Sequence, residues 1–322
     1  MSRQPAARAA RRRRRHAVIA MLCGALTLAG CAGTTPGADS REAKPLVIDP
    51  SADVSASAQL VAGRARNAEI VYLGELHDNA EHHAIEVRVL QALLADGSRP
   101  ALAFEMVPET RQAVLDAAVR SDADRGEVDR RLEWSAQGWP DFAMYWPLFE
   151  LARKNGLPVV ATDLDPTVTR RITRNGLGAA GDNPARLRSA MPDDPERDKA
   201  IAARMRAAHC NRLSEGRAMR MLESWYARNV VMARRVSEAL AQAPQVIVIM
   251  GRGHASPGAV TEQVLALRPG TRQLVVGLYE GQADSLMAGI ADVVWITPGR
   301  PHEDPCLNAP QRMGRGPGGI AG

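Results

Sequence analysis

The sequence predicts an α/β fold: a mainly parallel sheet covered by helices on both faces, with a helical insertion or subdomain. Short apolar runs of strand length alternate along the chain with longer stretches of helical periodicity. The runs are apolar throughout, which is typical of strands buried on both faces of a parallel sheet. With 322 residues and 45% hydrophobic content, the chain has enough apolar material for such a core.

The expected elements follow one another in a regular order. Strands are predicted from the apolar runs at 69–73, 101–106, 158–162, 246–250, 272–279 and 292–297. Asp78 or Asn79 stands where a helix needs an N-cap, and that helix is expected to reach about residue 94. Pro108 is suited to opening the next helix. A long stretch over 195–243 is helical in composition, with Gly216 as a candidate break.

The first residues are typical of a bacterial lipoprotein signal peptide. Residues 1–30 hold seven arginines and no acidic residue. The apolar stretch before Cys31 is about 14 residues long, too short for a comfortable transmembrane helix. LAGC, at 28–31, resembles a lipobox, so we expect cleavage before Cys31, a lipid such as palmitate on its thiol, and a flexible tether over 31–45. An ordinary signal peptide with an incidental cysteine is the alternative.

Loss of this segment changes the charge of the chain. The formal charge of +5 includes the seven arginines, and without them 34 basic residues stand against 36 acidic ones. A mature chain of net charge −2 argues against nucleic acid as a partner. Alanine follows Cys31, which by resemblance to sorting signals favours the outer membrane, with a lipid-anchored protein facing the periplasm.

Cysteine usage agrees with export. Cys23 leaves with the signal peptide and Cys31 takes the lipid, so Cys210 and Cys306 remain as an even pair in an oxidising compartment. We expect a disulfide that ties the irregular C-terminal tail, 298–322, to the helical region. Two unrelated thiols are the alternative.

Side chains capable of chemistry follow four of the predicted strands. In open parallel sheets, ligands bind beyond the carboxyl ends of the strands. The sequences GELHD, FEM, TDLD and GRGH supply Glu75, His77, Asp78, Glu105, Asp163, Asp165 and His254. His77, Glu105 and His254 can hold a divalent metal, or the three can work with Glu75 in acid–base chemistry. Helix caps and backbone-bonded carboxylates are the alternative for each residue taken alone.

Two further features have open interpretations. His82 and His83 begin the first helix about 100° apart, so one is expected near the same site and the other on a solvated face. The stretch 139–152, WPDFAMYWPLFELA, concentrates much of the small aromatic supply of the chain. Its amphipathic pattern suits packing between helices or a planar apolar ligand.

Several blocks together resemble the ChaN family of bacterial haem-binding lipoproteins, which are associated with haem uptake. The blocks are GELHDNAEHH, FEM, the 139–152 stretch, AHC, VVMA and VIVIMGRGH, in matching order and spacing over about residues 60–278. The resemblance implies a ChaN-like α/β domain over 46–297, with its helical insertion at about 111–243. The wider superfamily includes Tiki metalloproteases and erythromycin-esterase-like hydrolases, whose shared marks are matched here by His77, His254 and Glu105.

The family resemblance also implies a cofactor and partners. It implies haem bound through a tyrosine, a homodimer that encloses the haem, and a haem-uptake receptor as partner. Tyr145 is the first choice of ligand and Tyr226 the second, with Met144 and Trp146 as apolar surface for the macrocycle. The sequence departs from the family at Asn229, where an acidic residue is expected.

Two hypotheses follow from these observations. One is an outer-membrane-anchored haem-binding protein without turnover. The other is a metal-dependent hydrolase, a peptidase or an esterase, that uses Glu75, His77, Glu105 and His254.

Overall fold

The structure, a computed structural model, describes residues 44–181, 184–283, 291–302 and 306–307. The chain divides into two units, Met1–Ala43 and Lys44–Gly322, and all described residues belong to the second. The predictions for Cys31, its tether and most of the tail fall outside the described residues. Within the described part, no helix has the length and apolar character needed to cross a membrane.

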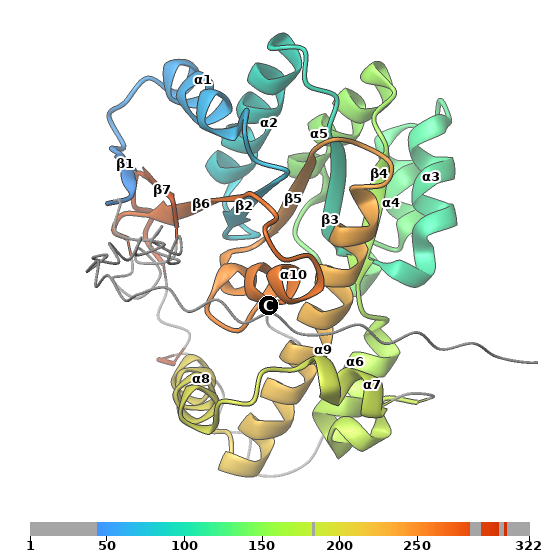
Figure 1. Cartoon of the computed structure of the whole chain (residues 1–322), viewed down its shortest axis with the longest axis vertical. Coiled ribbons are helices and arrows are strands. Elements are labelled where there is room, and N and C mark those ends of the chain that lie inside the picture. Colours follow the sequence, from blue (N-terminus) through green and yellow to red (C-terminus); the bar gives the residue numbers. More distant parts are fainter. Residues whose placement is uncertain (1–43, 182–183, 284–290, 303–305, 308–322) are drawn as a thin grey trace, which may run out of the picture. The chain divides into compact units, whose positions relative to one another are not determined.

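In the described residues, seven parallel strands form one sheet in the order β1-β7-β6-β2-β5-β3-β4 (Figure 1). The strands are β1 Leu46–Ile48, β2 Ile70–Glu75, β3 Ala101–Pro108, β4 Val159–Asp163, β5 Val246–Gly251, β6 Gln273–Glu280 and β7 Val293–Thr297. The parallel α/β fold is therefore confirmed. The six predicted strands are found with ends within two residues of those expected, whereas the short edge strand β1 was not predicted.

Helices cover both faces of the sheet. One face is covered by α1 Val54–Ala65, α2 Ala80–Ala95, α3 Gln112–Arg120, α4 Arg125–Leu132 and α5 Phe142–Asn155. The other face is covered by α9 Glu215–Ala239 and α10 Val260–Leu267. Successive strand residues point to opposite faces, so Val71 and Leu73 pack under the first layer while Ile70 and Tyr72 pack under the second. This explains why the strand runs are apolar throughout.

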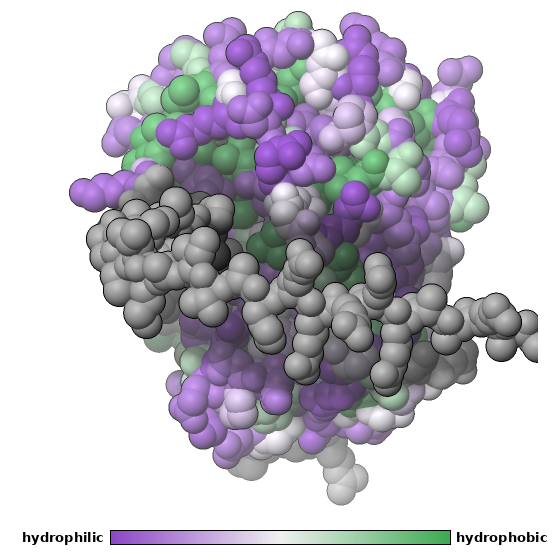
Figure 2. Space-filling model, viewed as in Figure 1, coloured by the Kyte–Doolittle hydropathy of each residue, from purple (hydrophilic) through white to green (hydrophobic). Residues whose placement is uncertain are grey.

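A separate group of helices packs on the first half of α9. It comprises α6 Pro166–Asn175, α7 Pro184–Ala190 and α8 Pro195–Ala208, with its own small apolar core around Leu222 and Tyr226. In the view of Figure 2, the described surface over this group is mainly hydrophilic. The region expected as one helical insertion at about 111–243 is thus two helical sections, which β4 separates.

Two predicted boundaries differ from the structure. Gly216 does not break the long helical stretch but lies in the first turn of α9. The break is the turn at 209–214, where Cys210 and Asn211 adopt positive φ and the Ser214 side chain caps α9 by accepting from the Arg217 N–H. Pro108 ends β3 and is followed by the 3-10 turn Glu109–Arg111, so α3 begins only at Gln112.

A disulfide joins the turn between α8 and α9 to the C-terminal tail. Cys210, in the turn between α8 and α9, is bonded to Cys306, and 96 residues separate the two in the sequence.

Candidate functional site

Four neighbouring strands bring most of the predicted site residues to one edge of the sheet. β2, β5, β3 and β4 are consecutive and parallel, so their carboxyl ends share that edge. His77 follows β2, Glu105 lies in the second half of β3, and Asp163 ends β4. His254 lies in the 3-10 turn Arg252–Ala255 after β5. The structure therefore brings His77, Glu105 and His254 together from separate stretches of sequence.

The Glu105 carboxylate is the centre of this group. Its Oε1 lies 3.1 Å from His254 Nε2 and accepts a hydrogen bond of 2.8 Å from Arg228. Its Oε2 lies 3.8 Å from His77 Nε2 and accepts a hydrogen bond of 2.7 Å from the Gly251 backbone N–H. Burial alone would raise the pKa of Glu105, but His254, His77 and Arg228 hold that pKa well below its usual value. The carboxylate is therefore ionised.

Arg228, on α9, links Glu105 to a second buried carboxylate. Its Nε and Nη2 donate to the two oxygens of Asp163, both at 2.8 Å. Burial raises the pKa of Asp163, and the charge of Arg228 opposes that rise. The guanidinium thus supplies the positive charge that two neighbouring buried carboxylates require.

His77 is the member of this group with the most access to solvent. Its side chain is 21% exposed, against 2% for Glu105 and 7% for His254. His77 Nδ1 lies 2.7 Å from Glu75 Oε1, so Nδ1 carries a proton, and in the neutral ring Nε2 has the lone pair. Burial works to lower the pKa of His77, but the charges of Glu105 and Glu75 outweigh it and raise the pKa. An imidazole oriented in this way can accept a proton from water or a substrate.

Aromatic rings flank both imidazoles. The Trp139 ring meets the His77 ring edge-on at a centroid distance of 5.1 Å. The Trp225 ring lies nearly parallel to the His254 ring at 6.1 Å. His254 Nδ1 is also 2.6 Å from Asn229 Oδ1, so the amide at the position that departs from the family holds this ring in place.

A second group of polar side chains lies behind His77 and is fully buried. It consists of Glu75, His83, Glu86 and Tyr145. His83 Nδ1 is 2.9 Å from Glu75 Oε2 and 3.1 Å from Glu86 Oε2, and the Tyr145 hydroxyl donates to Glu75 Oε1 at 2.7 Å. Burial alone would lower the pKa of His83, but Glu86 and Glu75 raise it to about 11. Burial and the charge of Glu75 raise the pKa of Glu86.

Of the two adjacent histidines, His83 is the one near the site, and the expectation that the other lies on a solvated face is wrong. His82 is buried. Its Nδ1 accepts a hydrogen bond of 3.0 Å from the Leu76 N–H, and its Nε2 lies 3.3 Å from Thr297 Oγ1. Burial lowers its pKa to about 4, so the ring is neutral. The helix starts at Asn79, whose side chain caps it, and turns both histidines inward.

The tyrosines expected to bind haem are buried. The chain has four tyrosines, and each is at most 3% exposed: Tyr72, Tyr145, Tyr226 and Tyr279. The Tyr145 hydroxyl lies in the closed network with Glu75, and burial together with that carboxylate raises its pKa. The Tyr226 hydroxyl donates to Asp198 Oδ1 at 2.7 Å, and burial and Asp198 raise its pKa. In the conformation described, a haem iron cannot reach the oxygen of Tyr145.

The apolar partners expected for haem lie on α5. Met144 and Trp146 are half-buried there and pack against the main core. Trp146 contacts the Phe142 ring, and the Arg153 guanidinium lies over it at 5.3 Å. Their contacts are those of helix packing.

Some carboxylates that follow the strands have structural roles. Asp165 caps α6 by accepting from the Thr167 N–H, and Asp78 is exposed and lies 3.7 Å from Arg300. Sequence reasoning missed Glu86 as a member of the buried group. The spacing of His83 and Glu86, three residues apart on one helix, could have indicated it.

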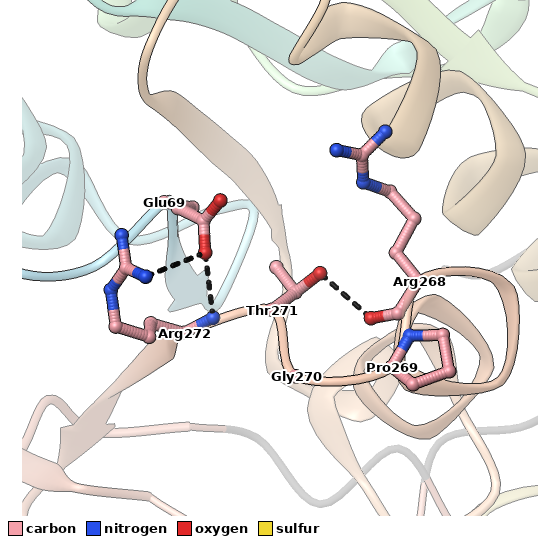
Figure 3. Close-up of a pocket in the computed structure, with 6 residues that line it drawn as sticks. All are labelled: Glu69, Arg268, Pro269, Gly270, Thr271 and Arg272. Carbon is pink, nitrogen blue, oxygen red and sulfur yellow. Dashed lines mark hydrogen bonds and ion pairs between the residues drawn. The ribbon is translucent and has the colours of Figure 1, made fainter.

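A surface hollow of about 420 Å³ lies at the opposite end of the strands (Figure 3). It is lined by Glu69 and by residues 268–272, which precede β2 and β6. Glu69 accepts from the Arg272 backbone N–H and pairs with its guanidinium at 3.4 Å. The hollow is polar, shallow and remote from the histidines, so it is not the candidate site.

Comparisons with known proteins agree with the fold. Residues 61–264 match the family described as haem-binding uptake, Tiki superfamily, ChaN. Among solved structures, ChaN of Campylobacter jejuni with cofacially bound haem is similar at 18% identity, with a TM-score of 0.61, over 73% of this chain and 90% of that one. The type III effector HopBA1 is less similar, at 17% identity and a TM-score of 0.48, over 80% of this chain and 100% of that one. No curated protein matches the sequence.

Proposed function

The chain belongs to the haem-binding uptake family of ChaN, in the Tiki superfamily, and we propose that it binds haem. The family match carries this proposal. It spans residues 61–264, which include both the sheet edge and the helical group on α9. Binding without turnover is the function that this family membership supports best.

We propose Tyr226 as the haem ligand in place of Tyr145. Releasing Tyr145 would break a buried carboxylate network. The side chain that packs beside Tyr226 is that of Arg197. Both lie next to Gly258, because a Cβ at that glycine would be 2.8 Å from Arg197 Nη1 and 3.5 Å from Tyr226 Cε1. Arg197 is 29% exposed and is held by surface ion pairs, and such pairs are worth about 1 kcal/mol or less.

The surroundings of Tyr226 suit a macrocycle. Trp225, Met205 and Met219 are partly buried on the same small core and offer apolar contact. A phenolate supplies a hard anionic donor for ferric haem iron. Asp198, at 2.7 Å, is placed to take up the hydroxyl proton when the phenolate forms.

A haemin titration tests the proposal. The protein should give a Soret band at micromolar haemin with the character of a high-spin tyrosine-ligated ferric haem. Tyr226→Phe should lose that character, because the oxygen donor is gone, while the matched control Tyr145→Phe should keep it. Absence of a Soret band in the wild type would exclude haem binding, and loss in Tyr145→Phe alone would move the ligand to Tyr145.

We also propose that the protein is anchored to the outer membrane through a lipid on Cys31 and takes part in haem uptake as a periplasm-facing lipoprotein. The LAGC sequence and the disulfide between Cys210 and Cys306 support an exported protein. Cys31→Ser should release the protein into the soluble fraction and abolish labelling with palmitate. A labelled, membrane-bound Cys31→Ser protein would contradict the anchor.

Hydrolysis is a second candidate function, favoured by the Glu105 group. His77 Nε2 lies 3.8 Å from Glu105 Oε2 while Glu75 holds Nδ1, and the His77 side chain is 21% exposed, an arrangement suited to activating water for attack on an ester or amide. Turnover should then fall at least about 100-fold in His77→Ala, the scale of one general base. His302→Ala, which removes an exposed histidine, is the matched control. No turnover across an ester and peptide panel would remove this candidate.

A further inference from the structure

The buried group behind His77 has an arrangement of donors that one proton does not satisfy. Three of its four members, Glu75, His83 and Glu86, each offer one atom that could bind a metal ion, and these atoms lie within 4.8 Å of one another. All three side chains are at most 2% exposed. Within the described residues, Glu86 Oε1 is buried without a hydrogen-bond partner, and Glu75 Oε2 has only the 2.9 Å contact with His83 Nδ1, a nitrogen that it shares with Glu86. A buried carboxylate oxygen without a partner is costly, so the group needs a further positive charge or donor.

The orientation of the His83 ring identifies the nitrogen that faces this group. His83 Nε2 is 2.9 Å from the backbone oxygen of His77, and because a carbonyl oxygen only accepts, Nε2 carries a proton. Nδ1 then points at Glu75 Oε2 and Glu86 Oε2, at 2.9 and 3.1 Å. A proton on Nδ1 can form a good hydrogen bond with only one of the two oxygens, and the geometry assigns it to Glu86.

We propose that Glu75, His83 and Glu86 form a buried binding site for one divalent first-row transition-metal ion, of the class of Zn²⁺ or Mn²⁺. Metal bonds of about 2.0–2.2 Å place neighbouring ligand atoms roughly 3 Å apart, which matches the distances from Nδ1 to the two carboxylates. One ion placed between them would contact all three donors, since the three ligand atoms lie within 4.8 Å of one another. A mixed imidazole and carboxylate set favours these ions over Ca²⁺ or Mg²⁺, which prefer oxygen ligands alone.

The neighbouring contacts are those expected around a metal ligand. Metal-bound histidines usually donate a hydrogen bond from the second ring nitrogen to a backbone carbonyl or a carboxylate, as His83 Nε2 does to the backbone oxygen of His77. The Glu75 carboxylate is oriented by the Tyr145 hydroxyl at 2.7 Å and by His77 Nδ1 at 2.7 Å. This site differs from the set predicted from the sequence, which was His77, Glu105 and His254. It is more deeply buried than His77, and two of its ligands lie on α2.

The test measures metal content in the purified full chain after equilibration with Zn²⁺ or Mn²⁺ and removal of the free ion. The wild type should retain about one ion per chain. Glu86→Gln, which keeps the side-chain volume, should bind at least about tenfold more weakly. Glu280→Gln removes another buried carboxylate at the same edge of the sheet and should retain the ion. Binding should raise the melting temperature of the wild type and not that of Glu86→Gln.

Three results would overturn the proposal. Wild-type protein without retained Zn²⁺ or Mn²⁺ would show that a proton alone occupies the group, and this measurement does not depend on any variant folding. Equal retention by the wild type and a folded Glu86→Gln would place the ion elsewhere. Loss of the ion in His254→Asn but not in Glu86→Gln would assign it to the group around Glu105.

Discussion

At the scale of single residues, the candidate site depends on the balance of charges around Arg228. Its guanidinium contacts Glu105 and Asp163, and both of these carboxylates are buried. Among the described residues, Arg228 is the only lysine or arginine that pairs with either of these two carboxylates. The stability of the sheet edge should therefore respond strongly to this one side chain.

Arg228→Met should lower the free energy of unfolding by about 3–5 kcal/mol, because it leaves two buried carboxylates without their shared partner. Urea unfolding followed by circular dichroism measures this change. Arg234→Met is the matched control on the same helix, since Arg234 pairs with Glu238 and Glu109 while its side chain is 33% exposed, and it should contribute about 1 kcal/mol or less. Equal effects of the two variants would contradict the assignment.

His82 should make the protein less stable as the pH falls from about 6.5 to about 4. Its folded pKa of about 4 lies below the ordinary value of 6.5, so the unfolded chain binds more protons in this window. The loss should be on the order of 3 kcal/mol. Urea midpoints across this range should fall less steeply in His82→Asn than in the wild type, and identical slopes would show that the ring is not held neutral.

Sequence reasoning could identify the residues that follow strands but not those contributed by helices. His77, Glu105 and His254 follow from the rule that parallel strands share a carboxyl edge. The ion-pairing role of Arg228 and the inclusion of Glu86 depend on how α9 and α2 are rotated against the sheet, which packing sets. The burial of Tyr145 likewise depends on the contact between α2 and α5.

At the scale of elements, the turn after β5 sets the position of His77. Gly251 ends β5, and its backbone N–H holds Glu105. β3 leaves its register with β4 between Phe104 and Pro108, which is where Glu105 reaches across to β5. The close approach of Gly251 to His77 therefore depends on the absence of a side chain at that position.

Gly251→Ala should displace His77 while leaving the fold intact. The added Cβ would lie 2.8 Å from His77 Nε2, and the partly exposed ring can move outward, so the cost should not exceed roughly 1–3 kcal/mol. The His77 ring signals in a nuclear magnetic resonance spectrum should shift. Gly253→Ala, where a Cβ meets nothing within 4 Å, is the control and should leave them unchanged.

Elements with strong apolar runs were predictable, and those fixed by local capping were less so. The central strands are found where expected, whereas β1 has three residues and was missed. Gly216 was expected to break a helix, but the Ser214 cap places it in a first turn, where a glycine is tolerated. The short turn at Cys210 and Asn211 has no comparable pattern in the sequence.

At the scale of the whole molecule, the disulfide is the longest covalent constraint in the described chain. It closes a loop across 96 residues, from the turn before α9 through β5, β6 and β7 to the tail. A cross-link of this span removes conformational entropy from the unfolded chain.

Cys210→Ser combined with Cys306→Ser should lower the free energy of unfolding by about 2–4 kcal/mol. Reduction of the wild type should give a similar loss, and the two treatments together should not add. Unfolding in urea with and without reductant measures both effects. A wild type whose stability is unaffected by reductant would show that the bond does not constrain the folded domain.

The placement of Tyr226 and Arg228 on one helix has a consequence for any ligand of the helical group. The two residues are two positions apart on α9. Tyr226 contacts Asp198, whereas Arg228 contacts the carboxylates of the sheet edge. If α9 moves as a rigid helix to uncover the Tyr226 hydroxyl, it must also carry the Arg228 guanidinium away from Glu105. Ligand binding at Tyr226 and proton binding at Glu105 are then thermodynamically linked, and each changes the affinity for the other by the same factor.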